Sequence, residues 1–191
     1  MSNKAFPQKV GPWTRLSSDC RYENPWIQVF HEDVITPGNT PGIYGRVHFK
    51  GTAIGIVPID DEGNTWLVGQ YRYTLDDYSW EIPMGGCPAG EEPLNAAKRE
   101  LEEEAGLLAR DWQQLMTLHT SNSITDEKGL VFVARGLSEG EMALEPSEDI
   151  TVKKLPLEEA IDWAMDGRIT DAIAVAALLK LAASNTNTKS W

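Results

Sequence analysis

The chain has 191 residues, of which 41% are hydrophobic, and this length and composition predict one compact globular body with a small extra element, not a disordered or membrane protein. A formal net charge of -12 argues against a nucleic-acid partner, because that contact needs clustered Lys and Arg facing the phosphates. The two cysteines have no metal-site spacing, and no apolar segment resembles an export signal or a membrane span. A reducing, cytoplasmic location is therefore expected, with no membrane contact.

The N-terminal region predicts a small β element. Residues 1–20 show no clear periodicity and are expected to be irregular. Two segments follow that are rich in β-branched and aromatic residues, Trp26–Ile35 and Ile43–Phe49, separated by a Pro-Gly-Asn cluster. This pattern predicts an antiparallel pair of strands.

A second pair of apolar segments, Thr52–Ile59 and Thr65–Tyr73, flanks the turn-forming run Asp60–Asn64. This arrangement predicts a second hairpin, whose strands are apolar enough to be central in a sheet. The later elements predicted are strands at Leu130–Ala134 and Ile150–Leu155, helices at Pro156–Met165 and Thr170–Ala183, and a frayed tail from Ser184.

Between these regions lies an acidic helix. Pro93 is typical of a helix start and Gly106 of a helix end. Its apolar residues form a narrow stripe that suits packing on a sheet by one face, namely Leu94, Ala97, Leu101 and Ala105.

Three glutamates of this helix, Glu100, Glu103 and Glu104, stand at positions i, i+3 and i+4 and share one side. Like charges so placed repel each other, so the group is either an ordinary solvated acidic face or is relieved by a bound cation. Carboxylate-only groups favour hard ions, which indicates Mg²⁺, with Mn²⁺ as an alternative.

The surrounding run from Gly85, GGCPAGEEPLNAAKRELEEEAGL, fits the pattern G-x5-E-x7-R-E-U-x-E-E-x-G-U, where U is aliphatic. It resembles the Nudix box at every defined position. The resemblance implies that Glu100 and Glu104, with Glu103, bind the metal, and that a carbonyl near Gly85 is a further ligand. Arg99 is expected to hold these carboxylates in place by pairing with Glu103 or Glu91.

The resemblance also implies a fold. It is a Nudix-type α/β/α sandwich of the α/β (α+β) class with a mixed sheet, preceded by a small N-terminal antiparallel β element. We expect the β element at residues 1–50, the Nudix domain at 51–184 and a flexible tail at 185–191.

Outside the box, Trp80–Pro83 and Gln70–Arg72 resemble motifs of the ADP-ribose and nucleoside-diphosphate-sugar pyrophosphatases. This branch implies a nucleotide sugar, such as a GDP- or ADP-hexose, or ADP-ribose as substrate. It also implies a homodimer. The expected substrate contacts are Arg72, Glu81, Trp26 and Tyr44. The ADP-ribose group usually has a proline about sixteen residues after the box, and this chain lacks one there.

The reaction implied is metal-dependent hydrolysis of the diphosphate, giving a nucleoside monophosphate and a sugar phosphate. Related enzymes use a glutamate from a loop beyond the box as the base, which indicates Glu148, with Glu127 as the alternative. Two other functions stay open at this point, namely a non-catalytic nucleotide sensor and a nucleoside-triphosphate pyrophosphohydrolase.

Overall fold

A computed structural model of the chain describes residues 5–144 and 149–186. The chain divides into two compact units. The first comprises the residues up to Gly51 together with Ser121–Glu127, and the second comprises Thr52–Thr120 together with the residues from Lys128 onward. In the described part, no helix has the length and apolar character needed to cross a membrane.

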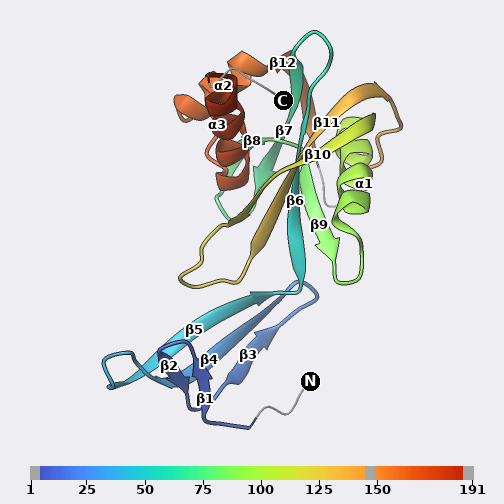
Figure 1. Cartoon of the computed structure of the whole chain (residues 1–191). Helices are drawn as coiled ribbons and strands as arrows, with labels where there is room; N and C mark the ends of the chain where they lie inside the picture. Colours follow the sequence, from blue (N-terminus) through green and yellow to red (C-terminus); the bar gives the residue numbers. More distant parts are fainter. Residues whose placement is uncertain (1–4, 145–148, 187–191) are drawn as a thin grey trace. The chain divides into compact units, whose positions relative to one another are not determined.

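The first unit is built on a five-stranded sheet around β4 (Figure 1). Its strands are β1 (Gln8–Val10), β2 (Trp13–Arg15), β3 (Asp19–Glu23), β4 (Ile27–Ile35) and β5 (Pro41–Phe49). The long pair β4–β5 is antiparallel along its whole length, which confirms the predicted pair. The expectation that residues 1–20 are irregular is wrong, because β1, β2 and the start of β3 lie there. Strands of three residues are too short to show a period in the sequence.

In its described residues, the second unit has seven strands and three helices. They are β6 (Gly51–Pro58), β7 (Asn64–Arg72), β8 (Asp77–Glu81), β9 (Met84–Pro88), α1 (Pro93–Ala105), β10 (Leu107–His119), β11 (Lys128–Glu139), β12 (Thr151–Pro156), α2 (Leu157–Met165) and α3 (Ala172–Thr186). One sheet has the order β10-β11-β6-β9 and the other β12-β7-β8. Strands β6 and β11 are parallel, whereas β10–β11 and both pairs of β7 are antiparallel.

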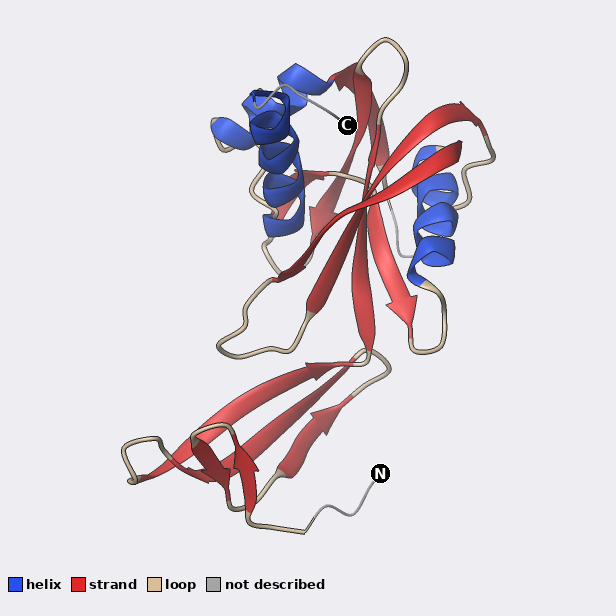
Figure 2. Cartoon of the chain, in the orientation of Figure 1, coloured by secondary structure: helices blue, strands red, loops and turns tan. Residues whose placement is uncertain are grey.

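Helices cover the strands of the second unit on two sides, as Figure 2 shows, with α1 on one side and α2 and α3 on the other. Two separate hydrophobic clusters fill the spaces between. Leu101 of α1 belongs to one cluster, with Ile54 and Phe132, and Leu178 of α3 to the other, with Leu67. The predicted α/β/α sandwich with a mixed sheet is confirmed.

The predicted hairpin of the second unit is wrong. β6 and β7 are joined by the expected turn, but only Ile59 and Thr65 form a bridge across it. The two strands then enter different sheets, β6 beside β11 and β7 between β12 and β8. Both strands are apolar on both faces, so each needs covering layers that a simple hairpin cannot supply. The partners β11 and β12 also lie far away in the sequence.

Helix α1 begins at Pro93 and ends before Gly106, whose φ of 63° is left-handed, as predicted. The expected apolar stripe is only partly right. Ala97 and Leu101 are buried, but Leu94 is 37% exposed. The buried side of the helix instead includes two of its glutamates, which brings charge into the interior of the second unit.

Candidate metal site

The buried glutamates of α1 are Glu100 and Glu104, with relative exposures of 7% and 2%. They lie one helical turn apart, so they face the same way. Glu103, between them, is half-buried. Carboxylates removed from water need hydrogen-bond donors or cations as partners, because burial strongly disfavours an unpaired charge.

The carboxylate of Glu100 lies against the backbone of β9. A Cβ built on Gly85 would stand 2.1 Å from the carboxyl carbon of Glu100, so only glycine leaves room for this side chain. Its Oε1 accepts a hydrogen bond of 2.6 Å from Nη1 of Arg99.

Arg99 connects helix α1 to the segment before it, which contains Gly86 and Glu91. Its Nη1 also donates to Glu103 at 2.9 Å, and its Nη2 donates to Glu91 at 3.2 Å and to the carbonyl of Gly86 at 2.8 Å. Burial opposes the charge of the guanidinium, but its hydrogen bonds to Glu91 and Glu100 outweigh that effect and raise the pKa of Arg99 further. A permanent cation therefore sits among these carboxylates.

Glu104 is oriented by the first residue of β9, Met84, whose backbone N–H donates to its Oε2 at 2.7 Å.

Arg72 and Glu81 form a second charged pair. Arg72 makes two hydrogen bonds with Glu81, one of them 2.8 Å long from Nε. Glu81 is 2% exposed. Hydrogen bonding to Glu81, with the charges of Glu104 and Asp171, raises the pKa of Arg72.

These residues suit a hard divalent cation. Glu100 and Glu103 already converge on a positive charge, the Nη1 group of Arg99, and all the side chains offer oxygen, which Mg²⁺ prefers. Within residues 5–144 and 149–186, no three acidic, histidine or cysteine side chains are grouped so that they could hold a metal ion directly. Binding by all three glutamates would therefore require their side chains to turn from their present partners.

The other predicted site residues lie in different places. Arg72 and Glu81 belong to the second unit, close enough to Glu104 for its charge to act on Arg72. Trp26 and Tyr44 belong to the first unit, where Trp26 is 71% exposed and Tyr44 lines a cavity of about 190 Å³. Glu148 falls outside the described residues.

Asp171 was not predicted from the sequence. It precedes α3, and its Oδ1 accepts a hydrogen bond of 2.8 Å from the N–H of Ala174. Burial, with the charge of Glu81, raises the pKa of Asp171. An aspartate just before a helix is a capping signal that sequence inspection can find, but its proximity to Glu81 and Arg72 depends on the tertiary fold.

Two family models match the chain. The model described as NUDIX domain matches residues 49–177, and the one described as nucleoside diphosphate sugar hydrolase N-terminal domain matches residues 13–47. They meet close to the boundary between the two compact units.

Several other proteins are similar to this chain. An ADP-ribose pyrophosphatase of Mycobacterium tuberculosis is 41% identical, over 90% of this chain and 84% of its own length. An ADP-ribose pyrophosphatase of Bacillus subtilis is 34% identical, over 76% of this chain and 80% of its own length. A crystal structure described as an ADP compounds hydrolase has a TM-score of 0.83 at 24% identity and covers 94% of this chain and 97% of that one. The similarity to this crystal structure shows that the two chains share a fold.

Proposed function

This chain belongs to the Nudix family of hydrolases, and from that premise we propose that it cleaves the diphosphate bond of a nucleoside diphosphate linked to a sugar. The products are a nucleoside monophosphate and a sugar phosphate. The observation that carries the proposal is the pairing of a complete Nudix box with an N-terminal segment that matches the nucleoside-diphosphate-sugar hydrolases. The relatives named as ADP-ribose pyrophosphatases support the same substrate class.

Nudix hydrolases generally use divalent metal ions, and for this chain we propose Mg²⁺, with Mn²⁺ as a substitute. Glu100, Glu103 and Glu104, with the carbonyl of Gly85, are the proposed ligands. A divalent ion there neutralises the diphosphate and lowers the pKa of a bound water. The buried position of Glu100 and Glu104 strengthens that interaction, because little bulk water screens it.

The chain's own side chains prepare the site. Arg99 fixes the carboxylates of Glu100, Glu103 and Glu91, so in the proposed role it orients ligands and does not react. Arg72 is proposed to bind phosphate. Glu81 occupies its Nε and one of its Nη2 hydrogens, so the phosphate would meet the remaining N–H donors of the guanidinium. Trp26 and Tyr44 are proposed to contact the base or the sugar.

For the base we propose Glu148, with Glu127 as the alternative. Replacing the base by glutamine should lower kcat more than it raises KM, because proton transfer is needed in the reaction and not for binding. A homodimer and a cytoplasmic location are likewise proposed.

The test is a panel of substrates incubated with Mg²⁺: ADP-ribose, ADP- and GDP-hexoses, diadenosine polyphosphates and dNTPs, with products identified by chromatography. We expect a mononucleotide and a sugar phosphate from the sugar-linked diphosphates, and none when the metal is chelated. Release of pyrophosphate from dNTPs alone would identify a nucleoside-triphosphate pyrophosphohydrolase. Binding of these nucleotides without any product would identify a sensor.

A further inference from the structure

The segment Ser121–Glu127, here called the strap, joins β10 to β11 but belongs to the first compact unit. Its backbone is bonded to β5. The N–H of Val47 donates to the carbonyl of Ile124 at 2.9 Å, and the N–H of Asp126 donates to the carbonyl of Val47 at 3.2 Å. These bonds accompany a parallel bridge between Val47 and Thr125. The strap is therefore paired with the sheet of the first unit as a short strand would be.

Strand β5 lies at an edge of this sheet, because among the described strands it pairs with β4 alone. Along an antiparallel edge strand, every second residue directs its N–H and C=O away from the partner strand. Val47 bonds to the strap on that side, so Gly45 and Phe49, two positions away on either side, face outward as well. Backbone groups left open along an edge can pair with a strand of another chain. The strap covers part of this edge.

Asp126 fastens the strap through its side chain. Its Oδ1 accepts a hydrogen bond of 2.9 Å from the N–H of Phe49, in place of the carbonyl that a neighbouring strand would supply. Its Oδ2 lies 2.6 Å from Nδ1 of His48 and 3.6 Å from Nη1 of Arg46. Burial opposes ionisation of this carboxyl, but the hydrogen bonds from His48 and Phe49 outweigh it and lower the pKa of Asp126. Asp126 is therefore an anion at neutral pH, held by three residues of β5.

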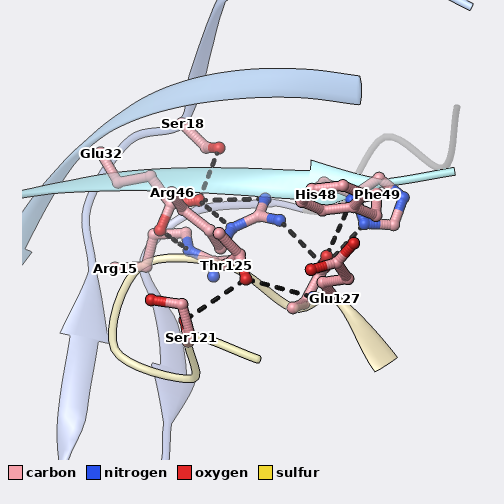
Figure 3. Close-up of polar contacts among 10 residues, drawn as sticks. Arg15, Ser18, Glu32, Arg46, His48, Phe49, Ser121, Thr125 and Glu127 are labelled. Atoms are coloured by element: carbon pink, nitrogen blue, oxygen red, sulfur yellow. Dashed lines mark hydrogen bonds and ion pairs between the residues drawn. The ribbon is translucent and has the colours of Figure 1, made fainter. Parts of the chain in front are cut away.

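Two side chains of β5 support this attachment. The hydroxyl of Tyr44 donates to the carbonyl of Ser123 in the strap. Arg46 stacks on the ring of Phe30, 4.4 Å from its centroid, and donates to Glu32, which is 3% exposed. Figure 3 shows the contacts of Arg46 with Glu32 on one side and with the strap on the other. The strap is thus attached to side chains that the first unit itself holds in place.

From this geometry we propose that the strap guards the edge of β5, and that its release lets this edge pair with the same edge of a second copy of the chain. Without the strap, outward-facing groups of Gly45, Val47 and Phe49 would form one continuous open edge. Ile43, which is 70% exposed, adds an apolar side chain beside it. Two identical edges can pair about a two-fold axis, so a second copy is a complete partner. The inference concerns the first unit alone and does not depend on the proposed function.

Amide hydrogen exchange tests whether Asp126 holds the strap. In the wild type, the N–H groups of Val47 and Phe49 should be protected. In D126A they should exchange at least about tenfold faster, because the lost hydrogen bonds involve a charged group. D126N is the second variant, since its amide keeps an acceptor for Phe49 and loses the charge that faces His48 and Arg46. Circular dichroism shows whether each variant is folded, and where D126A does not fold, D126N serves for every measurement.

Sedimentation velocity at several protein concentrations tests the guarding role. D126A should form larger assemblies than the wild type. Adding G45P should abolish them, because proline removes an outward-facing N–H of the same edge, and a Cβ at Gly45 would meet no atom within 4 Å.

The matched control is D33A, which also removes one negative charge from the first unit. Asp33 accepts a hydrogen bond of 2.7 Å from Ser17, but it belongs to β4, which has strand partners on both sides. D33A should match the wild type in both measurements.

Unchanged exchange in D126A and D126N would overturn the role of Asp126. Faster exchange without larger assemblies would overturn the guarding role, and so would assemblies that persist in D126A/G45P or that appear equally in D33A. Hydrolysis is not measured in these experiments, so a failure of the proposed function would be seen separately in the substrate panel.

Discussion

Gly85 and Glu100 are packed so closely that no side chain can stand between them, since a Cβ at position 85 would lie 2.1 Å from the Glu100 carboxyl carbon and 2.2 Å from its Oε2. Strand β9 therefore approaches α1 most closely at the buried carboxylate of Glu100. A Cβ on the next residue, Gly86, would meet no atom of the surrounding structure within 4 Å, so the two glycines form a natural comparison.

We expect Gly85→Ala to displace Glu100 and to lower turnover and the apparent affinity for Mg²⁺ by roughly 10–100-fold, the usual range for disturbing the support of a metal ligand. Gly86→Ala should leave both unchanged. Metal titrations of kcat for the two variants provide the measurement. Equal activity of the two alanine variants would contradict the close packing as a requirement of the site.

Glu104→Gln tests the ligand assignment. The amide keeps the shape and still accepts the Met84 N–H, but it loses the charge that a divalent ion needs, so turnover should fall at least about a hundredfold with the fold intact. Glu102→Gln on the same helix is the control, and calorimetric titration with Mg²⁺ separates lost binding from lost chemistry. Near-normal turnover in Glu104→Gln would remove Glu104 from the ligand set.

The helix α1 could be predicted from the sequence because its signals are local. These signals, Pro93, Gly106 and the spacing of Ala97 and Leu101, lie within one continuous segment. The helical spacing within that segment also predicts which glutamates lie on the same side of the helix. The sequence did not predict that Glu100 and Glu104 are buried, because their burial depends on how β9 packs against the helix.

The sheets were harder to predict because strand pairing is not local. β6 and β7 read as a hairpin from their turn, yet their partners β11 and β12 lie more than sixty residues farther along the chain. β10 was missed altogether: its exposed and buried positions do not alternate regularly, and its pairing with β11 shifts between Gln114 and Met116.

The pair of Arg72 and Glu81 predicts a coupled effect on stability. Arg72→Ala leaves a buried acceptor without its donor, which should lower the free energy of unfolding by roughly 1–3 kcal/mol. Adding Glu81→Gln should recover part of the loss, because the uncompensated charge is removed. Urea unfolding in the presence of a chelator measures both without a contribution from metal binding. Additive losses in the double variant would show that the two side chains do not act as a pair.

Asp171 predicts a pH dependence of stability. Its carboxyl has a pKa raised from its ordinary value of 3.8, first by burial and then by the charge of Glu81. The folded protein therefore keeps this proton at pH values where the unfolded chain has lost it. Between the unfolded and the folded pKa the native state binds more protons, so the contribution of Asp171 to stability falls as the pH rises and is constant above the folded pKa.

Asp171→Asn removes this ionisation and keeps an acceptor for the N–H of Ala174, which caps α3. Relative to the wild type, the variant should gain stability as the pH rises through the folded pKa. Asp166→Asn is a comparison in which the pH dependence of stability should have the opposite direction. A hydrogen bond from Arg168 lowers the pKa of Asp166, so the stability it contributes is present above pH 3.8 and is lost as the pH falls. Urea unfolding of the three proteins at stepped pH, without metal, measures both trends, and parallel curves for Asp171→Asn and the wild type would contradict the raised pKa.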